Sequence, residues 1–172
     1  MNWLLYFIFD FVFYSFFGWV LEEIYCYFVT GSFKKDGFLY GPFKPMYGIT
    51  MSILVYLYYN INITGPLSII MFFIIPTIIE FLSGYLLKRT FNLQYWDYSS
   101  LHINYKGIIS LKFSIYWAIL SSIVIIYFQP ILQHIYLTFQ ATCIFISTIL
   151  FVYIIIDFFD VVRNLRKTQI DQ

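Results

Sequence analysis

The sequence predicts an all-α membrane protein in which five transmembrane helices form one bundle. Of its 172 residues, 61% are hydrophobic and only 11% are charged, whereas a soluble domain carries about 25% charged residues. The apolar residues form continuous runs close to the ~20 residues that a spanning helix needs, and they lack the alternation of a transmembrane β-strand. Basic residues gather in alternate segments between these runs. These observations exclude a soluble globular domain and make membrane lipid the main partner.

Polar segments divide the chain into five predicted spans within a single transmembrane domain, residues 1–172. The spans cover residues 3–28, 45–59, 66–87, 108–128 and 137–159. The second span is the shortest and begins in a Gly/Pro-rich stretch, so we expect an irregular first turn that protein or a polar cavity covers. Inside the third span, Pro76 removes a backbone donor and should kink the helix about one turn before Glu80.

The distribution of Lys and Arg predicts the orientation, because cytoplasmic loops carry an excess of basic side chains. Nine of the ten basic residues form three groups of three: Lys34, Lys35 and Lys44; Lys88, Arg89 and Lys106; and Arg163, Arg166 and Lys167. The N-terminus and the two other connecting segments contain none. Five spans with the N-terminus outside and the C-terminus in the cytoplasm give this alternation. The aromatic-rich loop 88–107 should then lie along the inner membrane surface, and residues 160–172 should form a cytoplasmic tail.

Acidic residues inside or at the ends of the spans are candidates for function, since a carboxylate in the hydrocarbon region is costly. They are Asp10, Glu22, Glu23, Glu80, Asp157 and Asp160. Asp157 and Asp160 are best explained as an interfacial ion-pair cluster with a nearby arginine. Asp10 is more easily explained as a structural group, satisfied by the hydroxyls of Tyr6 and Tyr14 at helical spacing.

Glu22 and Glu80 lie at the same predicted depth, ~9–10 Å from the inner ends of the first and third spans at 1.5 Å per residue. Each shares a helix face with small residues, which favour close helix packing in membranes. One interpretation is an inward-facing polar site that binds a cation, a proton or a cationic group. The other is that each glutamate is a structural anchor, bound to loop amides or to a basic loop residue.

Other chemistries have no support in the sequence. Neither histidine and neither cysteine has a partner at ligand spacing, so we expect no metal site and no disulfide. No nucleophile elbow, P-loop or HExxH motif occurs, and we therefore expect no cofactor and no enzymatic activity. An enzyme acting on lipid headgroups ranks last, because no nucleophile stands beside a base. The formal net charge of +1 argues against nucleic acid as a partner.

Four motifs in chain order resemble one family. They are Phe13–Glu22, Gly37–Phe43 with Pro45–Gly48, Glu80–Ser83, and Trp96–Ser99 with Gly107. Over residues 11–130 the chain is similar to the small bacterial membrane proteins named putative ABC-transporter type IV, the CmpB-like permease family. This resemblance implies a multi-pass protein of the bacterial cytoplasmic membrane that carries a transporter label but no named substrate.

The resemblance also implies which residues form the site. It singles out Glu22, Gly41, Pro42, Tyr47, Glu80, Trp96 and Asp97. We expect Glu22 and Glu80 to line an inward-facing site, capped by the turn 41–48 and by Trp96 and Asp97, with hydroxyl donors from Tyr40 and Tyr47. The residues that we expect to shape the backbone and the packing around it are Gly18, Gly41, Pro42, Gly48, Pro76 and Gly107.

The leading hypothesis is therefore a membrane transport component that binds an ion or a small polar or cationic substrate. Because one short chain without an ATP-binding motif has little room for a pathway, transport would need self-association as a homo-oligomer or an ATPase subunit. The alternative is a structural or regulatory membrane subunit that binds lipid or a partner membrane protein.

The chain departs from the family's pattern at four positions. Lys44 and Ile108 stand where a cysteine and an arginine are expected, which puts a role at these positions in doubt. Asp36 and Lys88 stand where a basic and an acidic residue are expected, so their charges are exchanged. This exchange predicts a contact between the loop at Asp36 and the inner end of the third helix near Lys88.

Overall fold

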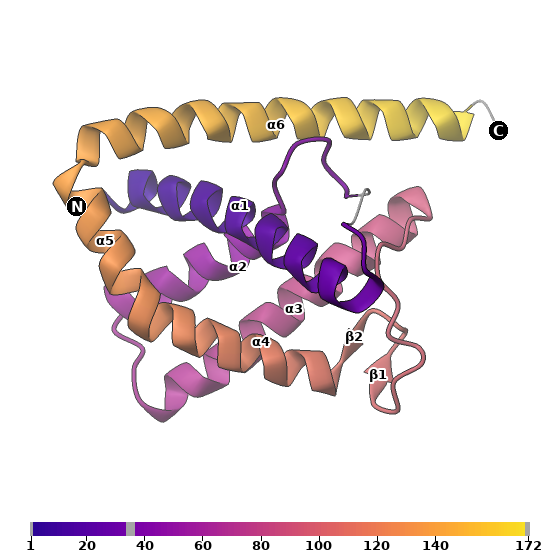
Figure 1. Cartoon of the computed structure of the whole chain (residues 1–172), viewed down its shortest axis with the longest axis horizontal. Helices are drawn as coiled ribbons and strands as arrows, with labels where there is room; N and C mark the ends of the chain where they lie inside the picture. Colours follow the sequence, from indigo (N-terminus) through magenta and orange to yellow (C-terminus); the bar gives the residue numbers. More distant parts are fainter. Residues whose placement is uncertain (1, 34–36, 171–172) are drawn as a thin grey trace.

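The computed structural model describes residues 2–33 and 37–170, with side chains up to residue 167. Its helices are α1 (Trp3–Thr30), α2 (Pro45–Val55), α3 (Pro66–Phe91), α4 (Leu111–Ile123), α5 (Gln129–Thr138) and α6 (Gln140–Ile170). A π-helical turn η1 (Tyr56–Asn60) extends α2, and a second one, η2 (Val124–Phe128), joins α4 to α5. A short antiparallel hairpin of β1 (Asn104–Tyr105) and β2 (Ile109–Ser110) lies between α3 and α4. In Figure 1, α1 begins at one end of the long axis and α6 ends at the other.

Four helical segments of the described chain are long and apolar enough to cross a membrane. They are Trp3–Thr30, Pro66–Phe91, Leu111–Thr138 and Gln140–Lys167. The predicted all-α membrane class is thus confirmed. The second predicted span corresponds to the 11-residue α2 and the five-residue η1, which together fall short of the ~20 residues that cross a bilayer.

At three places the helices run further than the predicted spans do. α3 continues through Lys88 and Arg89 to Phe91, so the loop 88–107 begins later than predicted. α6 continues to Ile170, and the predicted tail is helical to that residue. The predicted outer loop 129–136 is also helical, because it forms most of α5. Lys, Arg and Gln are polar but are good helix formers. A helix can therefore continue beyond the last apolar residue of a run.

The turn η2 carries the helix past Pro130 into α5. Gln129 donates its backbone N–H to the Val124 carbonyl, five residues back. Because Pro130 has no N–H, the next carbonyl in this pattern, that of Ile125, lacks a backbone donor. The hydroxyl of Tyr59 in η1 donates to it at 2.8 Å. The two π-helical turns are therefore joined, and the helix that begins at Leu111 continues as α5.

Residue Gln129 consequently lies inside the bundle, fully buried, where it organises a polar cluster on α1. Its Nε2 donates to the Tyr6 hydroxyl at 2.9 Å and to Asp10 Oδ1 at 3.0 Å. Its Oε1 accepts a hydrogen bond from the Tyr14 hydroxyl. The prediction that Asp10 is satisfied within the bundle holds, but its partner is the amide of Gln129, whereas the two tyrosine hydroxyls bind Gln129 instead of the carboxylate.

Two glycines let α2 pack directly against α1, as the small residues of the sequence indicate. A Cβ at Gly48 would overlap the Phe11 carbonyl oxygen and the Ser15 hydroxyl, and one at Gly18 would overlap the Tyr47 ring. Just before α2, the backbone N–H of Lys44 donates to the Ser15 carbonyl at 2.8 Å. The connecting segment therefore returns alongside α1, and α2 begins beside the middle of that helix (Figure 1).

Replacing Gly48 with alanine should lower the free energy of unfolding by about 1–3 kcal/mol, the usual cost of overpacking. Besides the Ser15 hydroxyl, a new Cβ would meet the Phe11 backbone carbonyl oxygen, which cannot move aside as a flexible side chain can. SDS titration of the protein in mixed micelles measures this change. Gly37→Ala is the matched control, because its Cβ would lie 3.2 Å from the end of the Lys44 side chain and 3.6 Å from the nearest backbone oxygen. Equal stability of the two variants would contradict the close α1–α2 contact.

Candidate functional site

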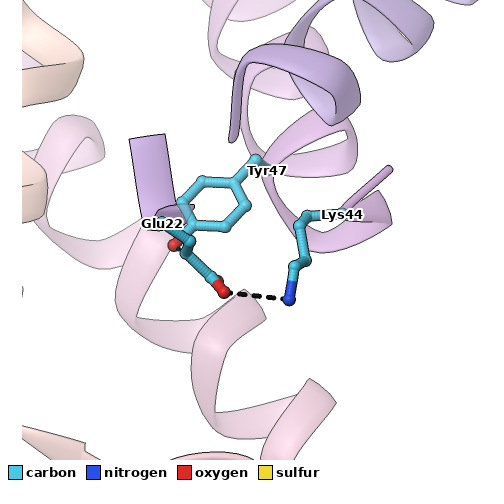
Figure 2. Close-up of polar contacts among 3 residues, drawn as sticks. All are labelled: Glu22, Lys44 and Tyr47. Carbon is cyan, nitrogen blue, oxygen red and sulfur yellow. Dashed lines mark hydrogen bonds and ion pairs between the residues drawn. The ribbon is translucent and has the colours of Figure 1, made fainter. Parts of the chain in front are cut away.

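Glu22 of α1 is held by two side chains from the start of α2. Its Oε2 forms an ion pair with the amine of Lys44 at 2.9 Å, and its Oε1 accepts a hydrogen bond from the Tyr47 hydroxyl at 3.0 Å. Figure 2 shows the carboxylate and the amine pointing toward each other, with the tyrosine beside them. The side chains of Lys44 and Glu22 are only 12% and 22% exposed. Glu22 thus matches the second interpretation, an anchor paired with a basic loop residue.

Glu80 of α3 lies deeper, with 2% of its surface exposed. Its Oε1 accepts two hydrogen bonds, from the Tyr98 hydroxyl at 2.9 Å and from the indole N–H of Trp117 at 3.2 Å. Tyr98 comes from the loop after α3, and Trp117 comes from α4. The other oxygen, Oε2, is buried and has no hydrogen-bond partner among the described residues. A buried carboxylate oxygen without a donor is costly, so Glu80 is the carboxylate that can still accept a ligand.

The loop between α3 and α4 is shaped to bring Tyr98 to Glu80. The indole N–H of Trp96 donates to the Ile108 carbonyl at 2.8 Å. Gly84 of α3 makes room for this contact, since a Cβ there would lie 2.6 Å from Ile108 and 3.0 Å from the Trp96 ring. Trp96 therefore closes the loop over α3, and it has no contact with Glu80 among those that the structure records for the described residues.

Asp97 and Gly107 stabilise the same loop from within. Asp97 Oδ1 accepts the backbone N–H of Ser99 at 2.9 Å, and this bond holds the pKa of the exposed Asp97 carboxyl below its usual range. Gly107 adopts a φ of 68° and lies against Asp97, where a side chain would not fit. Burial, and then the neighbouring Glu80 carboxylate, raise the pKa of Tyr98 well above its usual value. The phenol therefore stays protonated and remains a donor.

Residues 40–42 face α6, on the other side of α1 and away from Glu80. Asp157 of α6 accepts the backbone N–H groups of Gly41 at 2.8 Å and of Tyr40 at 3.3 Å. The Tyr40 hydroxyl accepts a hydrogen bond from Asn164 at 3.1 Å, and the residue is 70% exposed. Position 41 requires a glycine, because the Cβ of any other residue would lie only 2.8 Å from the Tyr153 hydroxyl. The neighbouring Pro42 is exposed.

Two predictions about this region therefore need correction. Asp157 binds loop amides, which replaces the predicted ion-pair cluster, because the Gly-containing turn offers two free N–H groups beside the middle of α6. The structure does not bring Tyr40 together with the glutamates. Asp36 and its predicted contact with Lys88 lie outside the described residues, while Lys88 itself donates to Gln94 at 3.0 Å.

A cavity of about 670 Å³ lies between α1, α2, α3 and the continuous helix α4–η2–α5. From the predicted site, its lining contains Gly18, Tyr47, Pro76 and Glu80. Glu22 is not among its lining residues. The Tyr47 and Trp117 rings line it and pack edge to face, with centroids 5.5 Å apart. The two glutamates are thus connected through this aromatic pair, but Glu80 alone of them faces the cavity.

Sequence reasoning missed Tyr98, Trp117 and Lys44. Tyr98 follows Asp97 in a motif already noted, so its position was a usable signal. Trp117 lies in an apolar run that gives no indication of its partner. Lys44 was noted as a basic loop residue and as a departure from the family's pattern, but it was not assigned to Glu22, which it neutralises.

A family model described as "Putative ABC-transporter type IV" matches residues 9–162. The chain belongs to this family. The match covers the glutamate centres, the cavity lining and the Asp157 anchor, and it confirms the resemblance of the four motifs. No curated protein and no solved structure matches the chain. With four helices long and apolar enough to cross a membrane, this family member is a multi-pass membrane protein.

Replacing Tyr98 with phenylalanine should lower the free energy of unfolding of this family member by about 1–3 kcal/mol, because a buried charged group loses a donor. The ring is kept, so packing against Phe113 is preserved. Thermal unfolding in detergent measures the loss. Tyr105→Phe serves as the control, since Tyr105 is exposed and should change stability little. An unchanged unfolding temperature for Tyr98→Phe would show that the loop does not stabilise Glu80.

Proposed function

We propose that this chain is the membrane-spanning component of a bacterial transporter, and that Glu80 with its cavity forms an inward-facing site for an ion or a small polar or cationic substrate. One observation carries the proposal. Glu80 Oε2 is buried beside the cavity without a hydrogen-bond partner in the described part of the chain. Intramembrane carboxylates face bundle interiors or water-filled cavities, and they mark substrate or ion pathways in membrane proteins.

The proposed topology has five crossings, with the N-terminus outside and the C-terminus in the cytoplasm of a bacterial cell. The first residues of α1 and the last residues of α6 lie at opposite ends of the long axis (Figure 1). This arrangement supports an odd number of crossings. The short α2–η1 segment completes the second crossing together with the segment that returns alongside α1. Irregular backbone at that depth is acceptable where protein covers it.

The proposed partner is an ATPase subunit, because the family carries an ABC-transporter name and the chain has no ATP-binding motif. The 31-residue α6 is ~46 Å long at 1.5 Å per residue and exceeds the ~30 Å hydrocarbon thickness. Its last turns carry Arg163 and Arg166. This basic end offers a cytoplasmic partner a rigid surface.

A second candidate is a structural or regulatory membrane subunit that binds lipid or a partner protein. It is favoured by the use of Glu22 and Asp157, both of which hold connecting segments against the helices. In that case Glu80 would be a third anchor, with Tyr98 as its partner. No enzymatic activity is part of either proposal.

The substitution Glu80→Gln should abolish substrate movement while leaving the chain in the membrane, because the amide keeps an acceptor for Tyr98 but removes the charge. The tagged chain, purified from native membranes with any ATPase that accompanies it, is reconstituted in vesicles with ATP. Accumulation of labelled Rb⁺, choline and tetraphenylphosphonium is then measured. We expect at least one of these cations to move with the wild type, and a loss of about tenfold or more with the variant.

Asp160→Asn is the matched control, since this carboxylate is exposed on α6, away from the cavity. Movement of a cation at the wild-type rate by Glu80→Gln would remove Glu80 from the site. If the wild type moves none of the three cations and no ATPase accompanies it, the structural subunit becomes the better assignment.

The topology is tested by placing single cysteines in a background without Cys26 and Cys143. A membrane-impermeant maleimide should label Thr64→Cys, between η1 and α3, in intact cells. It should label Ser100→Cys, between α3 and α4, only after the membrane is opened. Ser32→Cys, between α1 and α2, should likewise be labelled only after the membrane is opened. Labelling of Ser32→Cys and Thr64→Cys from the same side would show that the α2–η1 segment between them does not cross.

A further inference from the structure

The cavity beside Glu80 has the size of an organic molecule. Its volume of about 670 Å³ lies within the ~300–1,000 Å³ of sites that take small organic ligands. Among the lining residues that the structure describes, Glu80 is the only charged one. A Mg²⁺ or Ca²⁺ ion needs six or more oxygen ligands, and the described residues contain no group of three His, Cys, Asp or Glu side chains that could hold a metal. A bare metal ion would therefore be poorly coordinated here.

One carboxylate oxygen of the cavity, Glu80 Oε2, is an acceptor without a hydrogen-bond donor among the described residues. Glu80 Oε1 already accepts two hydrogen bonds, from Tyr98 and Trp117, whereas Oε2 accepts none from the described residues. An N–H group with a positive charge would satisfy this oxygen best, because charge-assisted hydrogen bonds are the stronger ones. The rings of Tyr47 and Trp117 line the same space, and aromatic rings attract cations.

The rest of the cavity lining indicates what kind of molecule would bear this positive charge. Apart from four hydroxyl side chains it is apolar, and it extends from Glu80 to exposed residues of α1 and of the η2–α5 segment, among them Phe17, Phe128 and Ile131. These residues lie at the surface of the bundle, so the cavity opens toward the hydrocarbon region between α1 and η2–α5. An apolar body can enter there without leaving the bilayer, and its burial is favourable in proportion to its area.

We propose that this cavity binds an amphiphilic amine, with the apolar body between α1 and α5 and the protonated amine on Glu80 Oε2. The proposal rests on the proposed function in taking this cavity as the substrate site. It narrows the substrate from cations in general to a molecule with one cationic centre on an apolar body. Lys44 contributes by neutralising Glu22 behind Tyr47, which leaves Glu80 as the acidic contact.

Charge complementarity favours this occupant over a phospholipid or a second copy of the chain. A phospholipid headgroup brings a phosphate, which the Glu80 carboxylate would repel. An acyl chain or an apolar helix of a second copy would fill the space but would leave Oε2 without a donor, which is unfavourable for a buried carboxylate oxygen. An amine supplies the donor and the charge together.

The test uses two probes that share one apolar body, biphenyl-4-ylmethanamine and biphenyl-4-ylmethanol. Binding to the full chain in lipid nanodiscs is measured by equilibrium dialysis, with empty nanodiscs to subtract partition into lipid. We expect the amine to bind about tenfold or more tightly than the alcohol, as a charge-assisted hydrogen bond provides. In Glu80→Gln, the affinity for the amine should fall to the affinity for the alcohol. The control Asp160→Asn should bind both probes as the wild type does.

A second variant, Leu120→Trp, fills the cavity while keeping Glu80, so it decides the matter even if Glu80→Gln fails to fold. It should weaken binding of both probes about tenfold or more. Equal affinity of the wild type for the two probes would overturn the proposal, as would amine binding that Leu120→Trp leaves unchanged. A dimer that Leu120→Trp converts to a monomer would show that a second copy fills the cavity, and would overturn it too.

The outcomes separate this inference from the proposed function, because dialysis needs neither ATP nor transport. Selective binding of the amine without movement of any cation would overturn the transport function and support the ligand class. Movement of Rb⁺ or choline that depends on Glu80, without preference for the amine, would support transport and overturn the ligand class.

Discussion

The cost of burying a carboxylate in a lipid-facing bundle governs how this chain folds. A charged oxygen there has no water to bind, so a donor must come from the protein. Four carboxylates draw donors from distant parts of the chain: Asp10 from Gln129, Glu22 from Lys44 and Tyr47, Glu80 from Tyr98 and Trp117, and Asp157 from the amides of Tyr40 and Gly41. These bonds connect α1 to α2 and α5, α3 to α4, and the first loop to α6. Hydrophobic packing in lipid gives helices little preference for particular partners, and the acidic residues supply that preference.

Features that depend on nearby residues were predictable from the sequence. Continuous apolar runs predicted the long helices, because burial in lipid requires them wherever they lie in the fold. Gly18 and Gly48 were expected to shape the packing, and the structure places both at the α1–α2 contact. Glu22 and Glu80 were singled out because a carboxylate within an apolar run is costly in any fold. These inferences need no knowledge of which helix contacts which.

The partners of those carboxylates were not predictable in the same way. Trp117 and Gln129 bind Glu80 and Asp10 from positions 37 and 119 residues away, and nothing local marks either residue as a donor. Two interpretations of Glu22 and Glu80 remained open at the level of sequence because both fit an intramembrane acid. The structure separates the two residues: Glu22 is paired with Lys44, while Glu80 keeps an oxygen toward the cavity. A single site lined by both glutamates was a reasonable expectation only as long as Lys44 had no known position.

The π-helical turn η2 sets the rotational phase of the residues that follow it in α5. Each residue of an α-helix advances the helix by about 100°, and a π-turn delays that advance within one turn. Because of this delay Gln129 faces Asp10, while Val124, Phe128 and Ile131 face the cavity. Shortening this helix by one residue between the cavity and α6 would leave its length and hydropathy almost unchanged, yet would rotate the amide away from α1 and a different face toward Glu80. An insertion or deletion in a connecting loop leaves the rotation of the helices unchanged and is therefore tolerable. One in the middle of this helix is not, because it rotates every residue that follows.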